Sequence, residues 1–210
     1  YMLRQSSSLI DAMISVCKHE DCLKSAMNCI KFGQYVAQGM WLQDSELLQL
    51  PHFTAAEAGH ASKGKPSAKT IQQYMDIPND SKKGLKDFNS HEKFDIFKCC
   101  EILPNITVES KVFVDDDEDD KVYEGDLCTV SVKLTRNNLA DESEKAGLVH
   151  APRFPYPKQE AWWIALGTKE GKIISIDKVT SPNKVVEHKI KFMAPRQGTY
   201  EFDLHVLSNA

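Results

Sequence analysis

The spacing of apolar residues changes at Pro104, and this change limits the possible fold more than any other feature of the chain. Before Pro104, apolar residues recur every three or four positions, as on the buried face of an α-helix. After Pro104 they alternate with polar residues, as in a β-strand with one buried face. The sequence therefore predicts an α + β chain in which the helices come first and the strands second.

The helical part is predicted to have two sections. Residues 1–66 should form a helical bundle, because two apolar stripes are separated by Asp21, which is placed to cap the second helix. Thr54 and Glu57 have the spacing of a capping box, which predicts a short helix after Thr54. Residues 67–104 contain short helical pieces joined by tight turns, which is typical of a helix–hairpin–helix module.

Residues 105–210 are predicted to form a β-sandwich. The alternating segments that indicate its strands are 106–114, 128–135, 161–166, 172–179, 185–192 and 199–207. An immunoglobulin-like or fibronectin-like sandwich usually has seven strands, so the last strand is expected to be missing. Trp162 and Trp163 are neighbours on the third strand, so one ring should enter the sandwich and the other should pack against the helices.

A run of six acidic residues interrupts an otherwise nearly neutral chain. The run consists of Asp115, Asp116, Asp117, Glu118, Asp119 and Asp120. The 210 residues carry a net charge of −4, and removing these six negative charges leaves +2. We interpret the run either as a solvated loop between the first two strands or as a docking patch for a basic segment of a partner. Because the remaining chain has no general basic field, nucleic-acid binding is not expected.

No catalytic, nucleotide-binding or metal site is predicted. The segment 59–66 is predicted to be a loop. It resembles a phosphate-binding loop, but Pro66 stands where that motif needs a hydroxyl group. Cys17, His19 and Cys22 do not have the spacing of zinc ligands. The six cysteines are therefore expected to be free thiols, and no cofactor is expected. No apolar run approaches the roughly 18 residues that a membrane helix needs.

Three segments together resemble the Sec-sixty-three (Brl) domain family. They are Gln38-Gly39-Met40-Trp41 followed by Leu47-Leu48-Gln49-Leu50-Pro51-His52-Phe53, then Pro155 through Trp163, then Phe192-Met193-Ala194-Pro195. Their order implies a helical bundle, a helix–hairpin–helix module and a fibronectin-like sandwich over nearly the whole chain. The family has a branch in endoplasmic-reticulum protein translocation and a branch of Ski-two-like helicases. The acidic run followed by residues 130–136 is more similar to the translocation branch.

The translocation branch implies a non-catalytic scaffold on the cytosolic side of the endoplasmic-reticulum membrane. Its partners would be translocation-channel subunits and companion translocon subunits, and it would support post-translational protein import. A lumenal Hsp70 would be recruited only through a J-domain that these residues lack. Since the chain starts at Tyr1 rather than at a methionine, it is expected to be a fragment, and only the full-length protein would contact the membrane.

The alternative is an accessory cassette of a Ski-two-like RNA helicase that contacts RNA or partner proteins. This alternative predicts a basic surface in the helix–hairpin–helix region. The lysines gathered there are Lys63, Lys65, Lys69, Lys82, Lys83 and Lys86. Because Asp76, Asp80 and Asp87 lie nearby in the sequence, a solvated surface of mixed charge is the preferred interpretation. Glycosylation of Asn105 would instead indicate a lumenal or extracellular fragment.

Overall fold

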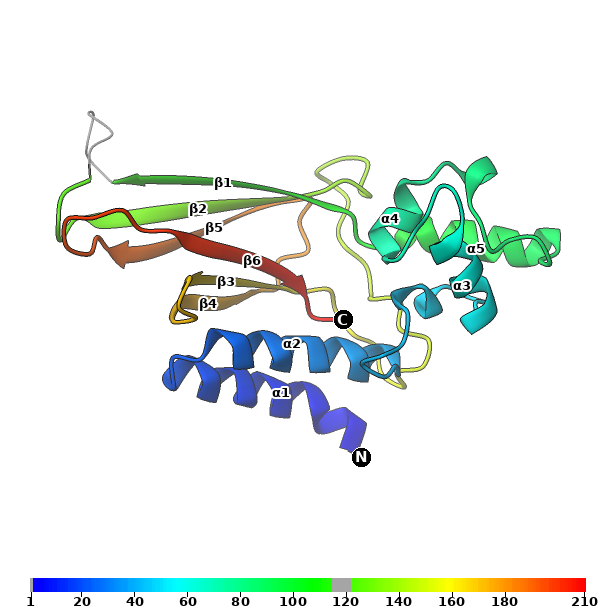
Figure 1. Cartoon of the computed structure of the whole chain (residues 1–210), viewed down its shortest axis with the longest axis horizontal. Helices are drawn as coiled ribbons and strands as arrows, with labels where there is room; N and C mark the ends of the chain where they lie inside the picture. Colours follow the sequence, from blue (N-terminus) through cyan, green and yellow to red (C-terminus); the bar gives the residue numbers. More distant parts are fainter. Residues whose placement is uncertain (1, 115–121) are drawn as a thin grey trace.

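The computed structural model describes residues 2–114 and 122–210 (Figure 1). Its helices are α1 (Met2–His19), α2 (Leu23–Gln38), the short 3₁₀ helix η1 (Glu46–Gln49), α3 (Ala55–Lys63), α4 (Ile71–Asp76), the 3₁₀ helix η2 (Asn79–Ser81) and α5 (Ser90–Ile102). Its strands are β1 (Ile106–Val114), β2 (Leu127–Arg136), β3 (Trp162–Thr168), β4 (Ile173–Val179), β5 (Val185–Met193) and β6 (Phe202–Ser208). This order confirms the predicted α + β fold, with helices followed by a β-sandwich.

The described strands form two antiparallel sheets with the orders β1-β2-β5 and β4-β3-β6. The two sheets lie face to face (Figure 1) and enclose a core made by alternate residues of their strands. The buried members of this sandwich core are Val130, Val132, Leu134, Trp162, Ile164, Leu166, Val179 and Ile190. Alternation along β2 and β3 thus produces the inner layer that the period of two predicts.

The helices α1 and α2 pack side by side and cover the outer face of the β4-β3-β6 sheet (Figure 1). Trp163 points from β3 toward these helices, whereas its neighbour Trp162 belongs to the sandwich core. The residues buried between helices and sheet are Ile10, Ile14, Leu23, Ala26, Ile30, Trp163, Ala165 and Ile176. The expectation that the two tryptophans face opposite sides is therefore confirmed.

Residues 46–103 surround a third core, and we call this region the α3–α5 module. Its buried residues are Leu47, Leu50, Phe53, Ala58, Ala61, Ala68, Tyr74, Ile77, Leu85, Ile96, Cys99 and Leu103. The capping box of Thr54 and Glu57 opens α3 as predicted, and equivalent boxes open α4 and α5. The predicted boundaries at residues 66 and 104 stay predictions, although the three cores are separate clusters.

Two local predictions were wrong. Asp21 does not cap α2, because Cys22 occupies the N-cap position and Asp21 adopts a positive φ of 55°. The Asp21 carboxylate instead accepts a hydrogen bond of 2.6 Å from the backbone N–H of Ile173, at the start of β4. The segment 59–66 is not a continuous loop, since α3 extends to Lys63 and ends at Gly64. A tertiary contact and a helix extension thus replaced the local patterns.

Asp177 joins the two sheets along one side of the sandwich. Its carboxylate on β4 accepts hydrogen bonds from His188 Nε2 on β5 at 3.1 Å and from Ser175 Oγ at 2.7 Å. Lys18 Nζ of α1 lies 3.7 Å from the same carboxylate. Burial by itself would raise the pKa of Asp177, but the hydrogen bonds from Ser175 and His188 and the charge of Lys18 lower it below its usual range.

Replacing Asp177 with asparagine is expected to lower the urea midpoint of unfolding at pH 7. Because the pKa of Asp177 is lower in the folded state, its ionised form stabilises the fold above the ordinary value of 3.8, and this contribution is lost as the pH falls through the lowered value. The difference between the wild-type chain and Asp177→Asn should therefore shrink below about pH 4. Asp80→Asn, at an exposed position, is the control; a pH-independent difference would contradict the assignment.

Candidate nucleic-acid interface

Two loops of the α3–α5 module lie side by side and carry lysines. The first loop follows α3 at Gly64, and the second follows η2 at Lys83. A Cβ atom at Gly64 would lie 2.7 Å from Lys83 Cγ, and one at Gly84 would lie 2.8 Å from the Glu57 carbonyl oxygen. The second loop is therefore packed directly against the first turn of α3, at Glu57, and against the start of the first loop.

Five lysines on these loops and at the end of α3 are exposed to solvent, and we call them the lysine surface. They are Lys63, Lys65, Lys69, Lys83 and Lys86. Within residues 2–114 and 122–210, none of the five side chains takes part in an ion pair. Cations that are clustered on neighbouring loops and not neutralised by carboxylates are suited to contact a phosphate backbone.

Lys82 does not belong to the lysine surface. Its side chain is buried, and its Nζ donates hydrogen bonds to the backbone carbonyl oxygens of Met75 and Ile77. Burial lowers the pKa of Lys82, while Cys100 and Asp76 partly oppose this change. Tyr74, whose ring lies 5.4 Å from this Nζ, donates to the Lys83 carbonyl oxygen at 3.1 Å. Lys82 and Tyr74 therefore attach the second loop to the core of the α3–α5 module.

The solvated surface of mixed charge that the sequence predicts is present, but its acids and lysines are not paired within the described residues. Asp76, Asp80 and Asp87 are exposed, as the sequence suggested. Asp76 accepts a hydrogen bond from Gln72 Nε2 at 2.9 Å, within the same helix. In the described part of the chain, none of the three carboxylates forms an ion pair with a lysine of the surface. The loops therefore keep available cations despite the neighbouring acids.

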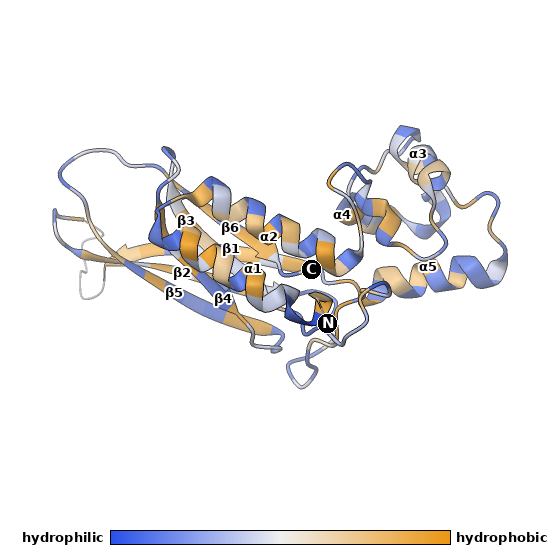
Figure 2. Ribbon diagram, turned by 90° about the horizontal axis from the view of Figure 1, so that it is seen from below, coloured by the Kyte–Doolittle hydropathy of each residue, from blue (hydrophilic) through white to orange (hydrophobic). Residues whose placement is uncertain are grey.

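A second exposed surface is apolar and lies on α1, α2 and the segment that follows them. Figure 2 shows hydrophobic residues on the side of these helices turned away from the sheets. The exposed apolar side chains are Leu9, Met13, Val16, Phe32, Trp41 and Leu42. Trp41 and Leu42 are 74% and 73% exposed and border a groove of about 690 Å³. Phe32, Trp41 and Leu42 line this groove together, and grouped apolar exposure of this kind marks contact surfaces.

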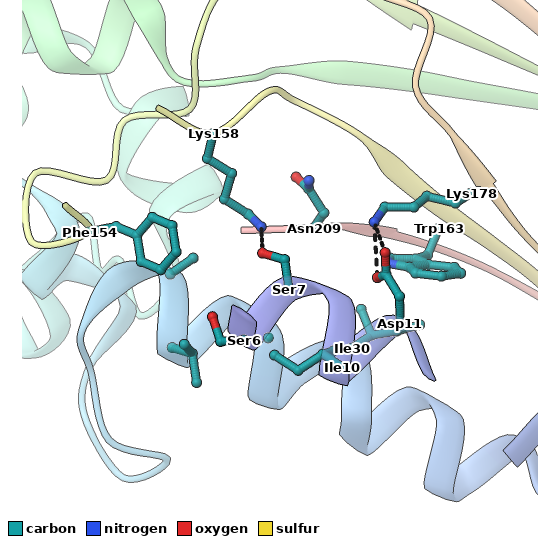
Figure 3. Close-up of a pocket in the computed structure, with 13 residues that line it drawn as sticks. Ser6, Ser7, Ile10, Asp11, Ile30, Phe154, Lys158, Trp163, Lys178 and Asn209 are labelled. Carbon is teal, nitrogen blue, oxygen red and sulfur yellow. Dashed lines mark hydrogen bonds and ion pairs between the residues drawn. The ribbon is translucent and has the colours of Figure 1, made fainter. Parts of the chain in front are cut away.

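The junction of α1 with the sandwich holds charged groups but has no room for a ligand (Figure 3). Lys178 Nζ donates to both carboxylate oxygens of Asp11 at 2.9 and 2.7 Å, and Lys158 Nζ donates to Ser7 Oγ at 3.3 Å. The cavity between them measures about 20 Å³, which is the space of one water molecule. Burial, together with the charge of Lys178, lowers the pKa of Lys158. These contacts attach the helix to the sheet.

A wider cleft of about 460 Å³ separates α2, the α3–α5 module and the end of the sandwich. Gln38 Nε2 donates to the His150 carbonyl oxygen at 3.0 Å, and Gln34 Nε2 donates to the Ser208 carbonyl oxygen at 2.8 Å. Burial lowers the pKa of His150, although a hydrogen bond with the Gln49 backbone opposes this change. The described atoms offer His150 Nε2 no hydrogen-bond partner. The cleft thus contains one unsatisfied nitrogen and no charged cluster.

The acidic run cannot be assessed as a site, because Asp115 to Asp120 lie outside the described residues. Its role as a docking patch stays a prediction.

All six cysteines are free thiols, with Cys17 Sγ and Cys29 Sγ 4.0 Å apart. Among the residues that the structure describes, no group of three potential metal ligands comes together. None of the described helices has the length and apolar character needed to cross a membrane.

Comparison with known families decides between the two branches of the resemblance. A family model described as the Sec63 Brl domain matches residues 1–210. The chain belongs to this family. As a member of the Brl domain family, it shares similarity with much longer proteins, of which it spans 9%. The resemblance found in the sequence is therefore confirmed at the level of the family.

Several relatives of this Brl domain are named as helicases. The U5 small nuclear ribonucleoprotein 200 kDa helicase of Homo sapiens is 31% identical over 210 residues, which are 100% of this chain and 9% of the relative. Its Drosophila melanogaster counterpart is 29% identical over 210 residues with the same coverage. The DExH-box ATP-dependent RNA helicase DExH13 of Arabidopsis thaliana is 29% identical over 213 residues, again covering 100% and 9%.

These relatives overturn the translocation branch. The predictions of a translocation scaffold, of translocation-channel subunits as partners and of a place at the endoplasmic-reticulum membrane were wrong. The three relatives above match along the whole chain and are named as ribonucleoprotein and RNA helicases. The exclusion of nucleic acid was wrong for the same reason. It rested on the nearly neutral charge of the chain outside the acidic run, whereas the lysine surface is a local feature of two loops.

Proposed function

We propose that this Brl domain is a non-catalytic accessory cassette of a large, nuclear RNA helicase and that its lysine surface contacts the phosphate backbone of RNA. The observation that carries the proposal is the match of the whole chain to proteins named as ribonucleoprotein and RNA helicases. The chain is only 9% as long as those relatives, so the helicase activity would belong to the remainder of the protein.

The structure supports this proposal through the position of the lysines. Lys63, Lys65 and Lys69 lie along the first loop and at its start, and Lys83 and Lys86 lie along the second. A strand of RNA can therefore contact several ammonium groups at once. Lysine acts as a point charge toward phosphate, so contacts of this kind position the RNA without reading its sequence. The cassette would thus hold RNA in register for the helicase.

The apolar surface on α1 and α2 supports the accessory role. Phe32, Trp41 and Leu42 are too exposed for an isolated domain to benefit from them, and the chain is a small part of its relatives. We assign this surface to contact with another part of the same helicase polypeptide. Contact there would orient the lysine surface relative to the rest of the enzyme.

Binding of single-stranded RNA at several salt concentrations tests the RNA contact. The probe is a fluorescent RNA of about 20 nucleotides, and five phosphate contacts should give a slope of log affinity against log salt of about −3.5. Replacing Lys65, Lys83 and Lys86 together with glutamine should weaken binding and reduce the size of the slope by about 2. Fluorescence anisotropy measures both quantities.

A second triple variant separates this surface from general charge. Lys111, Lys133 and Lys189 lie on the outer face of the β1-β2-β5 sheet, and their replacement by glutamine changes the net charge by the same amount. This variant should bind RNA like the wild-type chain. An equal loss in both triple variants, or no measurable binding by the wild-type chain, would refute the proposal.

A further inference from the structure

The two helices α1 and α2 bring a pair of thiols into contact near the turn that joins them. Cys17 lies in the last turn of α1 and Cys29 in the second turn of α2, with their Sγ atoms 4.0 Å apart. Both side chains are partly buried against the core between these helices and the β4-β3-β6 sheet. The structure describes all six cysteines, and within the described chain no other two sulfur atoms make such a contact. The fold thus pairs Cys17 with Cys29, although Cys22 is nearer to both in the sequence.

The turn between the two helices is attached to the sheet, which keeps the thiols close together. The Asp21 carboxylate accepts a hydrogen bond from the Ile173 backbone N–H at 2.6 Å. The Leu23 backbone N–H donates to the Gly171 carbonyl oxygen at 2.9 Å. A disulfide needs the two sulfur atoms to approach by about 2 Å, a movement on the scale of a rotation about the Cα–Cβ bonds. The bond therefore needs a change of side chains and not of helices.

We propose that Cys17 and Cys29 form a reversible disulfide when the protein reacts with hydrogen peroxide, and that this bond joins α1 to α2. In the first step, the Cys17 sulfur attacks one peroxide oxygen and the O–O bond breaks, which gives a sulfenic acid and one water molecule. In the second step, the Cys29 sulfur attacks the sulfenic sulfur and the S–O bond breaks, which gives the disulfide and a second water molecule. The two thiols together lose two electrons and two protons, and the peroxide is reduced to water.

The surroundings of the thiols assign these two roles. Burial, together with the neighbouring Cys17, raises the pKa of Cys29, so Cys29 keeps its proton and reacts slowly with peroxide. Once Cys17 carries the sulfenic acid, the contact between the two sulfur atoms replaces a diffusional encounter and favours the second step. Cys99, in the core of the α3–α5 module, is only 3% exposed, and burial with a contribution from Cys100 raises its pKa to about 12. Cys99 is therefore protected from the same oxidation.

The disulfide would act on the helices that carry the exposed apolar surface. Leu9 and Met13 belong to α1 and Phe32 belongs to α2, so a covalent bond between the helices fixes these side chains relative to one another. Disulfides of intracellular proteins are transient and often sense oxidants. An effect on contact with the rest of the helicase rests on the proposed function, whereas formation of the bond does not. Failure of the bond and failure of the RNA contact are therefore separate results.

Peptide mapping after treatment with hydrogen peroxide tests the bond. Remaining thiols are alkylated, the protein is digested, and mass spectrometry should find one peptide pair joined through Cys17 and Cys29 with the loss of two hydrogen atoms. Dithiothreitol should reverse the product, and Tm of the oxidised protein should rise by about 5 °C or more. In concentrated urea, the shorter loops Cys17–Cys22 and Cys22–Cys29 should replace this pairing. The same pairing pattern in folded and unfolded protein would overturn the proposal.

Two serine variants test the roles of the thiols. Cys22→Ser is the matched control and should form the disulfide and show the rise in Tm like the wild-type chain, because the exposed Cys22 takes no part in either step. Cys29→Ser should form no intramolecular bond and should accumulate a sulfenic acid at Cys17, which a dione reagent traps. Loss of the bond in Cys22→Ser, a covalent dimer through Cys22 as the main product, or a sulfinic acid at Cys17 without the bond would overturn the proposal.

Discussion

Replacing Arg136 with methionine is expected to lower the free energy of unfolding by about 3–5 kcal/mol. Arg136 is 1% exposed, and its Nε donates to Glu160 Oε1 at 2.6 Å. The guanidinium also donates to the backbone carbonyl oxygens of Ser181 and Asn183. Methionine fills a similar volume but leaves the Glu160 carboxylate buried without its cation, and two carbonyl oxygens lose their donor. Urea unfolding of both proteins measures the difference.

The double variant shows how much of this loss comes from the unpaired charge. Glu160 Oε1 also accepts from Trp162 Nε1 at 2.7 Å, and glutamine at position 160 keeps an acceptor for the indole. Arg136→Met combined with Glu160→Gln should therefore recover a large part of the stability, because no buried carboxylate remains. A loss below about 1 kcal/mol for Arg136→Met alone would mean that the pair is solvated and would contradict this account.

The elements of the fold were predictable because their signals are local. The change of period at Pro104, the capping box at Thr54 and the opposite directions of Trp162 and Trp163 each depend on residues within a few positions of one another. The partner of Asp21 was not predictable, since Ile173 is 152 positions away in the sequence. Its backbone N–H comes within reach of the Asp21 carboxylate only in the folded chain, where the start of β4 lies beside the turn between α1 and α2.

The lysine surface was half predictable. The sequence places six lysines in one region, but it cannot show that Lys82 turns inward to the carbonyl oxygens of Met75 and Ile77 while Lys83 stays exposed. It also cannot show that the loops around Gly64 and Lys83 are in contact. Both facts depend on packing around Tyr74, which the sequence identifies only as an apolar position on a short helix.

The wrong choice of branch has a physical explanation. The acidic run, which lies outside the described residues, was weighted as a family trait. The segments that carried the resemblance contribute to the cores. Leu47, Leu50 and Phe53 belong to the α3–α5 module, and Trp162 and Trp163 belong to the other two cores. Core segments therefore identified the family, and the acidic run misidentified the branch.

Replacing Trp163 with alanine is expected to lower the free energy of unfolding by about 3–5 kcal/mol and to loosen α1 and α2 from the sheet. The Trp163 ring packs against Ile10 and Ile30, and Lys178 Nζ lies 5.1 Å from its centre. Lys178 in turn binds Asp11 of α1, so one substitution weakens an apolar and an ionic attachment together. Urea unfolding measures the loss, and hydrogen exchange should become faster in α1 and α2.

Trp41→Ala is the matched control, because it removes the same side chain from an exposed position. Its effect on stability should stay within about 0.5 kcal/mol. In Trp163→Ala, exchange in α5 should stay unchanged, since Ile96 and Cys99 belong to a separate core. Equal acceleration in α5 would show that the cores unfold as one unit.

If the apolar surface contacts the rest of the helicase, Trp41→Ala should weaken that contact without loss of stability. Trp163→Ala should weaken the same contact only by displacing the helices.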